Sequence, residues 1–255
     1  MPAVLAVDDS VMTALAGFRT ASAELPDRWL LQRRLDRKFV FSSALLEPLL
    51  SALAPHFSVL RAGVAPIATY QTVYFDTAGR QFYEDHRRGR LPRHKVRLRH
   101  HLERRLSFLE VKRKTADGRT TKARLERPFG DQPWDSGAAA FVLQSSRLAP
   151  AALHAQLSMT FKRITLVGDH VDERMTVDSE LEMWTDGARR PLPGVAIAEV
   201  KQACYANDTP SVRGLRALHL RERGFSKYCL GTAMLAPVRS HAFGESLRLL
   251  ERLGR

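Results

Sequence analysis

Charged and apolar residues alternate most regularly between Arg93 and Lys122, and this alternation predicts β-strands. Successive side chains of a strand point to opposite faces of its sheet, so each segment has one charged and one apolar face. Asp117-Gly118 marks a hairpin turn within the stretch. We therefore expect three neighbouring antiparallel strands, each with a row of mostly basic groups. The rows are Lys95, Arg97 and Arg99; Glu110, Lys112 and Lys114; and Lys122, Arg124 and Glu126.

Similar patterns place the other elements. Strands are also expected at 33–41, 70–76, 157–167, 171–183 and 195–204, which gives about eight in all. Helical spacing of apolar residues predicts helices at 11–18, 43–53, 80–87, 133–148, 212–223, 226–235 and 243–253. Strands that come mainly as hairpins, with helices between some of them, favour an α+β fold with a mostly antiparallel sheet.

The chain divides into three parts by this pattern. Residues 1–30 are mixed and are interpreted as an N-terminal extension. Residues 31–236 hold the predicted sheet and form the main domain. Residues 237–255 form a tail whose helix has Leu247, Leu250 and Leu253 on one side.

Alternation alone fits two architectures. In an open sheet the charged faces would meet water, which is common for antiparallel sheets. In a barrel of about eight strands the charges would line a lumen and the helices would pack outside. The basic rows contain few acids, and like charges directly opposite each other destabilise a sheet, so we favour the barrel.

The composition points to an anionic partner. The net charge is +13, and the pI is about 10.4, although 44% hydrophobic and 26% charged residues are ordinary for a globular protein. The two cysteines have no metal-ligand spacing, and no apolar run is long enough to span a membrane, so we expect a cytoplasmic protein. Neither a P-loop nor a dinucleotide-binding glycine motif is present.

The acids are concentrated at Glu110, Asp178, Glu180 and Glu199. Basic groups for phosphate oxygens, with a few carboxylates for a divalent metal, are the combination that phosphoryl transfer needs. Glu199 is the first candidate metal ligand. Glu110 and Glu180 are equally well explained as ion-pair partners.

Seven segments, in this order, resemble the VTC (polyphosphate polymerase) domain of the triphosphate tunnel metalloenzyme superfamily. They are Arg-Leu-Asp-Arg-Lys-Phe (34–39), Tyr-Gln-Thr-Val-Tyr-Phe-Asp-Thr (70–77), Lys-Val-Arg-Leu-Arg (95–99), Phe-Leu-Glu-Val-Lys-Arg-Lys (108–114), Thr-Thr-Lys-Ala-Arg (120–124), Ala-Glu-Val-Lys (198–201) and Phe-Ser-Lys-Tyr (225–228).

The resemblance implies an antiparallel eight-stranded tunnel with a charged lumen. It also implies transfer of the γ-phosphate of ATP to a polyphosphate chain, with Mn²⁺ or Mg²⁺. Glu199 would hold the metal, with Glu110 and Glu180 as further candidates, and Ser226 would add a hydrogen bond to phosphate. The implied phosphate-binding residues are Lys38, Arg97, Arg99, Lys112, Lys122, Arg163, Arg174 and Lys227.

Two positions depart from the family pattern. The hydrolase branch has Glu-x-Glu-x-Lys in its first strand, where this chain has Arg34, Asp36 and Lys38; this favours a polymerase over a triphosphatase. Family polymerases often have Tyr where this chain has Phe161. Any membrane coupling would need a separate partner, because no membrane module is expected here.

Two alternatives to the polymerase remain open, a triphosphatase of the same fold and a non-catalytic polyphosphate- or nucleotide-binding module. A nucleic-acid-binding protein is disfavoured, since aromatic content is 8% and no stacking platform is expected among the basic rows.

Overall fold

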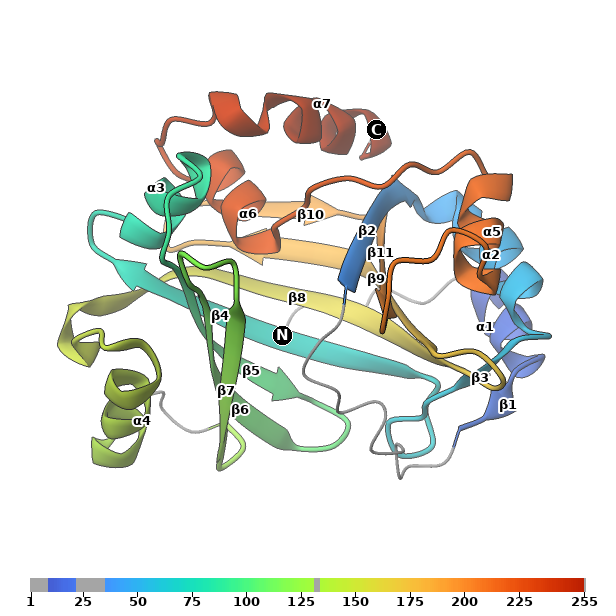
Figure 1. The fold of residues 1–255 in the computed structure, drawn as a ribbon, viewed down its shortest axis with the longest axis horizontal. Coiled ribbons are helices and arrows are strands. Elements are labelled where there is room, and N and C mark those ends of the chain that lie inside the picture. The colour runs from blue at the N-terminus through green and yellow to red at the C-terminus, as the bar shows by residue number, and fades with distance from the viewer. Residues whose placement is uncertain (1–8, 22–34, 131–133, 255) are drawn as a thin grey trace.

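A computed structural model describes residues 9–21, 35–130 and 134–254. Their dominant feature is one large sheet, which is antiparallel except for the pairing of β1 with β3 (Figure 1). The strands are β1 (Arg19–Thr20), β2 (Leu35–Ser42), β3 (Phe57–Val59), β4 (Ile67–Thr77), β5 (Arg93–His101), β6 (Leu106–Lys114), β7 (Thr120–Arg127), β8 (Leu153–Gly168), β9 (Glu173–Trp184), β10 (Arg189–Leu192) and β11 (Val195–Gln202).

The sheet is open, so the expected closed eight-stranded barrel is wrong. Eleven strands are present, and the main path runs β2-β11-β9-β8-β4-β5-β6-β7, with β1, β3 and β10 as side branches. Within the described residues no backbone pairing joins β2 to β7. The sheet nevertheless curls strongly, as the distance of 4.0 Å between Lys122 Nζ on β7 and Asp36 Oδ2 on β2 shows.

A connecting segment occupies the edge where β2 would have to meet β7. Glu222 forms a β-bridge with Phe39, and the amide of Arg223 donates to the carbonyl of Lys38 at 2.8 Å. The outer edge of β2 is thus already paired here, which is a physical reason why the barrel does not close. The predicted helix over 212–223 is correspondingly too long; it ends at Ala217, and a turn at Leu218 and His219 precedes the bridge of Glu222.

Helices cover the outer, apolar side of the sheet at two places. At one end, α1, α2 and α5 pack on Phe39, Phe41, Ile164 and neighbouring residues. At the other end α4 packs on β6 and β7. The helices are α1 (Asp9–Ala16), α2 (Leu46–Leu53), α3 (Gln81–Arg87), α4 (Ser136–Ser146), α5 (Pro210–Ala217), α6 (Lys227–Leu235) and α7 (Gly244–Leu253), with short 3-10 turns η2 (Ser43–Leu45), η3 (Pro150–Ala152) and η4 (His241–Phe243).

Helix α6 departs from the expectation that all helices lie outside. Its Tyr228 stacks on Tyr74 of β4 (5.3 Å between ring centroids), and its Lys227 contacts Asp178 of β9. Gly231 lets the helix approach closely, because a Cβ there would lie 2.6 Å from Leu157 and 2.8 Å from Met183. Helix α6 therefore fills one end of the concave side with apolar contacts.

The N- and C-terminal helices each contribute to one of two hydrophobic cores. Val11, Leu15 and Phe18 are buried in the cluster beneath α2, and Leu249 and Leu250 of α7 are buried in the cluster around α6. Positions 33, 34 and 133, which fell within predicted elements, lie outside the described residues. No helix in the described part of the chain combines the length and apolar character that crossing a bilayer requires.

Candidate functional site: a charged concave face

The three predicted basic rows lie side by side on one face of β5, β6 and β7. The register places Arg97 opposite Glu110, and Glu110 opposite Arg124. It also places Lys95 opposite Lys112, and Lys112 opposite Lys122, so three ammonium groups follow one another across three strands. The predicted alternation is confirmed, and the contact between β7 and β2 shows that this face is the concave one.

A second wall is formed by β2, β11, β9 and β8. Arg163 of β8 lies opposite Asp178 of β9, and Glu199 of β11 lies opposite Lys38 of β2. Arg174 of β9 lies opposite Lys201 of β11 on the same face. We refer to these residues and the three rows together as the charged concave face.

The N-terminus of α6 adds two groups. Ser226 caps the helix by accepting a hydrogen bond from the amide of Cys229 (3.3 Å), and it also accepts one from Lys95 Nζ (3.0 Å). Lys227 forms an ion pair with Asp178, which is also held by Arg163 Nε at 2.5 Å. The predicted pair Ser226 and Lys227 is therefore brought to the charged concave face from a distant part of the sequence.

Aromatic rings lie among the basic groups, contrary to expectation. Tyr70 and Phe161 are stacked with their centroids 5.4 Å apart, and the guanidinium of Arg163 lies 5.1 Å from the Tyr70 ring. Arg124 lies 4.3 Å from the ring of Phe108. Guanidinium groups already flank these rings. The rings therefore stabilise the arginines and are poor stacking platforms for nucleobases.

The positive charges are only partly compensated. Burial, Arg97 and Arg163 lower the pKa of Arg99 to about 10, against the opposing effect of Glu110. Partial desolvation and the ammonium groups of Lys122 and Lys95 lower the pKa of Lys112 to about 8. Burial alone would raise the pKa of the Tyr74 phenol, yet Arg97 and Arg99 bring it below its ordinary value. These shifts indicate a strongly positive potential, which favours a bound anion.

The carboxylates of this face are already engaged. Glu110 pairs with Arg97 at 2.6 Å; burial opposes ionisation, but Arg97 and Arg99 lower the pKa of Glu110 to about 2. Glu199 pairs with Lys201 at 2.8 Å and lies 3.9 Å from Lys38. In the described ranges no three His, Cys, Asp or Glu residues are close enough to hold a metal together. The residues present therefore do not fit a metal centre made by protein groups alone.

Glu180 is separated from the other two acids. A β-bulge between Thr160 and Lys162 shifts the register, and Glu180 has a left-handed backbone (φ 49°). Its carboxylate pairs with Lys162 at 2.8 Å, and Lys162 alternates with Phe161 and Arg163. Glu180 thus leaves the charged face, which alternation without a bulge did not predict.

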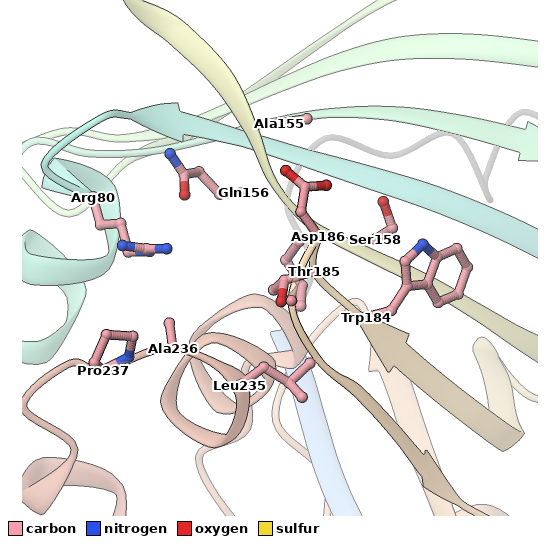
Figure 2. Close-up of a pocket in the computed structure, with 12 residues that line it drawn as sticks. Arg80, Ala155, Gln156, Ser158, Trp184, Thr185, Asp186, Leu235, Ala236 and Pro237 are labelled. Carbon is pink, nitrogen blue, oxygen red and sulfur yellow. The ribbon is translucent and has the colours of Figure 1, made fainter.

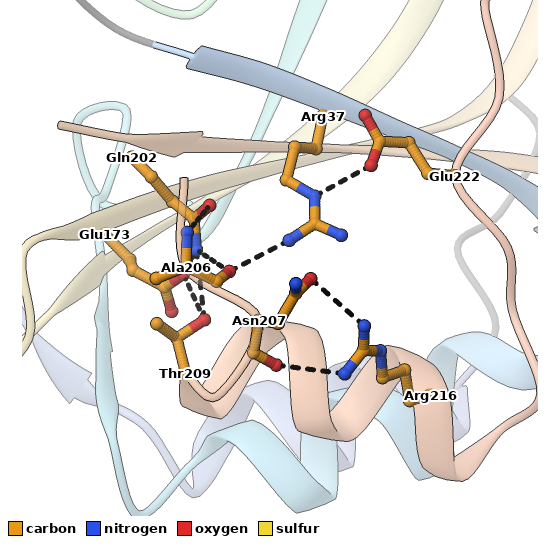
Figure 3. Close-up of polar contacts among 8 residues, drawn as sticks. All are labelled: Arg37, Glu173, Gln202, Ala206, Asn207, Thr209, Arg216 and Glu222. Atoms are coloured by element: carbon orange, nitrogen blue, oxygen red, sulfur yellow. Dashed lines mark hydrogen bonds and ion pairs between the residues drawn. The ribbon is translucent and has the colours of Figure 1, made fainter. Parts of the chain in front are cut away.

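A hydrogen-bond network on the outer side of the sheet fixes the segment that leads to α6. Arg37 is only 4% exposed; it donates to Glu222 and to the carbonyl of Ala206, each at 2.9 Å, and stacks on Tyr205 at 4.5 Å. Buried Glu173 accepts from Gln202 and Thr209, each at 2.6 Å (Figure 3). Arg37 therefore holds both ends of the connection between β11 and α6.

The predicted phosphate and metal ligands did not include several residues that the fold brings to this face. Lys95 and Lys201 have the same parity as the predicted phosphate ligands, so the pattern contained the signal for them. Asp178 was noted among the concentrated acids, but its pairing with Arg163 and Lys227, like the stacking of Tyr70 on Phe161, needed the tertiary structure.

Comparison with known structures supports the fold. A Hippeastrum protein described as adenylyl cyclase-like with a dominant triphosphatase activity superposes with a TM-score of 0.50, at 13% identity, over 79% of this chain and 97% of that one. An adenylate cyclase-like protein from Bacillus halodurans gives 0.45, at 12% identity, over 77% and 95%. The superposition with the first protein supports a shared fold. Sequence identities this low do not show a shared activity.

The sequence comparisons give one match. No curated protein is detectably similar to this chain. Residues 33–129, which include β2 and the strands of all three basic rows, match the family model of the VTC domain. The resemblance read from the sequence motifs is thereby confirmed over residues 33–129.

Proposed function

We propose that the charged concave face binds triphosphates and polyphosphate, and that it transfers the γ-phosphoryl group of ATP to the end of a polyphosphate chain. The observation that carries this proposal is the crowding of basic groups on adjacent strands, which adds to the effect of burial in lowering the pKa of Arg99 and Lys112. A polyanion with closely spaced charges would relieve that repulsion. The VTC-domain match supports polyphosphate as the polyanion.

In this proposal no covalent enzyme intermediate is needed. The terminal phosphate oxygen of the chain attacks the γ-phosphorus, the bond to the bridging oxygen breaks, and ADP leaves. Arg97, Arg99 and Arg163 would neutralise charge on the transferred group, with Lys38 on the facing strand. Lys112, Lys122, Arg174, Ser226 and Lys227 would align the rest of the polyanion. Positioning and charge neutralisation supply most of the catalysis in phosphoryl transfer.

A divalent cation enters this proposal as part of the substrate. Mg²⁺ and Mn²⁺ are commonly held by one or two carboxylates together with substrate phosphates. Glu199 and Glu110 are the predicted carboxylate ligands on the charged concave face, but both are held by basic groups in the free protein. We therefore expect the metal to bind weakly alone and much more tightly with a triphosphate.

The deciding experiment incubates the purified protein with ATP and Mn²⁺ or Mg²⁺ and follows ADP, free phosphate and polymer by ³¹P NMR. Chelator-sensitive formation of ADP and polyphosphate supports the proposal. Release of phosphate without polymer indicates a triphosphatase, the activity described for the Hippeastrum protein of similar fold. Salt-sensitive polyphosphate binding without turnover indicates a binding module and contradicts both enzymatic functions.

A further inference from the structure

A second candidate site lies away from the charged concave face. It is a cavity of about 290 Å³ between the start of β8, the turn after β9 and the end of α6 (Figure 2). The packing of Leu157 and Met183 against Gly231 lies next to it on the side of the charged face. Its lining includes Arg80, Gln156, Asp186, Leu235 and Pro237.

Arg80 is the cation of this cavity. Its Nε is buried and has no hydrogen-bond partner, and no ion pair of its guanidinium is found among the described residues. Its backbone is left-handed (φ 53°), which costs about 1 kcal/mol or more for a residue other than glycine. Because Nε is enclosed by protein, a ligand in the cavity could be reached only by the terminal nitrogens of this guanidinium, which has no carboxylate partner among the described residues.

The opposite side of the cavity offers the complementary group. Figure 2 shows the Arg80 guanidinium reaching into the space from α3 and the Asp186 carboxylate across from it. Leu235, Ala236 and Pro237 form an apolar floor between them. Gln156 donates through Nε2 to the carbonyl of Thr77 at 3.2 Å, which fixes that side chain at the rim.

This arrangement disfavours the polyanions proposed for the charged concave face. Arg80 is the only basic residue among the described residues of the lining, and Asp186 would repel additional negative charge. A single guanidinium fits one carboxylate by paired hydrogen bonds. Asp186 fits an ammonium group, and the apolar floor fits a short hydrocarbon side chain.

We propose that this cavity binds a small apolar amino acid, with its carboxylate on Arg80 and its ammonium group on Asp186. The ligand would neutralise the guanidinium of Arg80 and cover the apolar floor at the C-terminal end of α6. This site is chemically distinct from the phosphate site and does not depend on it.

Calorimetric titration of the full chain with leucine, methionine and phenylalanine tests the proposal. We expect at least one of them to bind. Arg80→Gln should weaken binding about 10- to 100-fold, the value of a charge-assisted hydrogen bond. Asp186→Asn should remove the preference for leucine over 4-methylpentanoate, which lacks the amine. Arg88→Gln, at an exposed position outside the cavity, is the matched control and should bind like the wild type.

The same samples are titrated with tripolyphosphate, and their folding is checked by circular dichroism. Failure of all three amino acids to bind the wild type overturns the amino-acid site, as does unchanged binding by a folded Arg80→Gln variant. If those samples still bind tripolyphosphate, only the amino-acid site has failed and the proposed function stands.

Discussion

At the scale of single residues, the charged concave face is organised by incomplete charge compensation. Arg97 has Glu110 as its partner, whereas Arg99, 8% exposed, shares that carboxylate at 3.9 Å and is crowded by Arg97 and Arg163. Buried charges without close partners cost free energy. We infer that Arg99 is retained at some cost in stability because it binds an anion.

Replacing Arg99 by Met should therefore separate affinity from stability. We expect tripolyphosphate affinity to fall about 10- to 100-fold, since a hydrogen bond to a charged group contributes about 1.5–3 kcal/mol. The melting temperature of the free protein should be unchanged or higher. Calorimetry and thermal unfolding measure the two effects. The control is Arg119→Met, at an exposed turn; a large fall in melting temperature without loss of affinity would show that Arg99 is structural.

The partly buried His101 gives a pH dependence of stability. Burial, reinforced by Arg99, lowers the pKa of His101 to about 4 from an ordinary value of 6.5, while Glu110 opposes the shift. The unfolded chain therefore binds a proton near pH 6.5 that the folded chain binds only near pH 4, so stability falls as the pH decreases through this window. The melting temperature of His101→Gln should depend less on pH between 7 and 4.5. An equal pH dependence in both proteins would contradict this assignment.

At the scale of elements, the connection from β11 to α6 decides where Ser226 and Lys227 lie. Its two ends are held by Arg37, which binds Ala206 and Glu222 from β2 (Figure 3). The segment also pairs with β2 through Glu222 and Arg223. The same contacts that occupy the edge of β2 therefore deliver the N-terminus of α6 to the charged concave face.

Arg37→Met should loosen this connection without removing a group from the charged concave face. We expect a loss of tripolyphosphate affinity of about tenfold and faster proteolysis within residues 203–226, because Lys227 and Ser226 are then less well positioned. Arg213→Met, which breaks only the exposed pair with Asp208 in the same segment, is the control. If proteolysis and affinity both match the wild type, Arg37 does not position α6.

Close packing of α6 gives a separate prediction. Gly231→Ala would place a methyl group 2.6 Å from Leu157 and 2.8 Å from Met183, so the helix or its neighbours must shift. Overpacking of this kind costs about 1–3 kcal/mol, and chemical denaturation should measure that loss. Gly79→Ala is the matched control, since no atom lies within 4 Å of its added Cβ. Equal stability of the two variants would show that α6 does not plug the sheet tightly.

At the scale of the whole molecule, the sheet is curled but not closed. Among the described residues its two edges meet through the side chains of Lys122 and Asp36 and not through backbone pairing. In this part of the chain β7 pairs only with β6, and backbone amides of an edge strand exchange more readily. A polyanion bound by Lys122 and Lys38 would bridge the two edges.

Hydrogen exchange of the full chain tests this bridging. We expect polyphosphate to slow exchange in β7, while β10, which pairs with β9 alone among the described strands, serves as the internal reference. Lys122→Met should abolish much of the protection in β7. If polyphosphate binds with unchanged exchange in β7, the anion contacts one wall only and does not span the opening.

The sequence by itself determined the alternation of the strands. Side-chain parity in a strand depends only on position along the chain, so Arg97, Arg99, Lys112 and Lys122 were correctly placed on one face. The tertiary structure decided the rest. The bulge beside Glu180, the pairing of Glu222 with β2 and the entry of α6 into the concave side all arise from contacts between distant segments. Local pattern does not record these contacts, so it did not reveal that the sheet stays open or that its carboxylates are already paired.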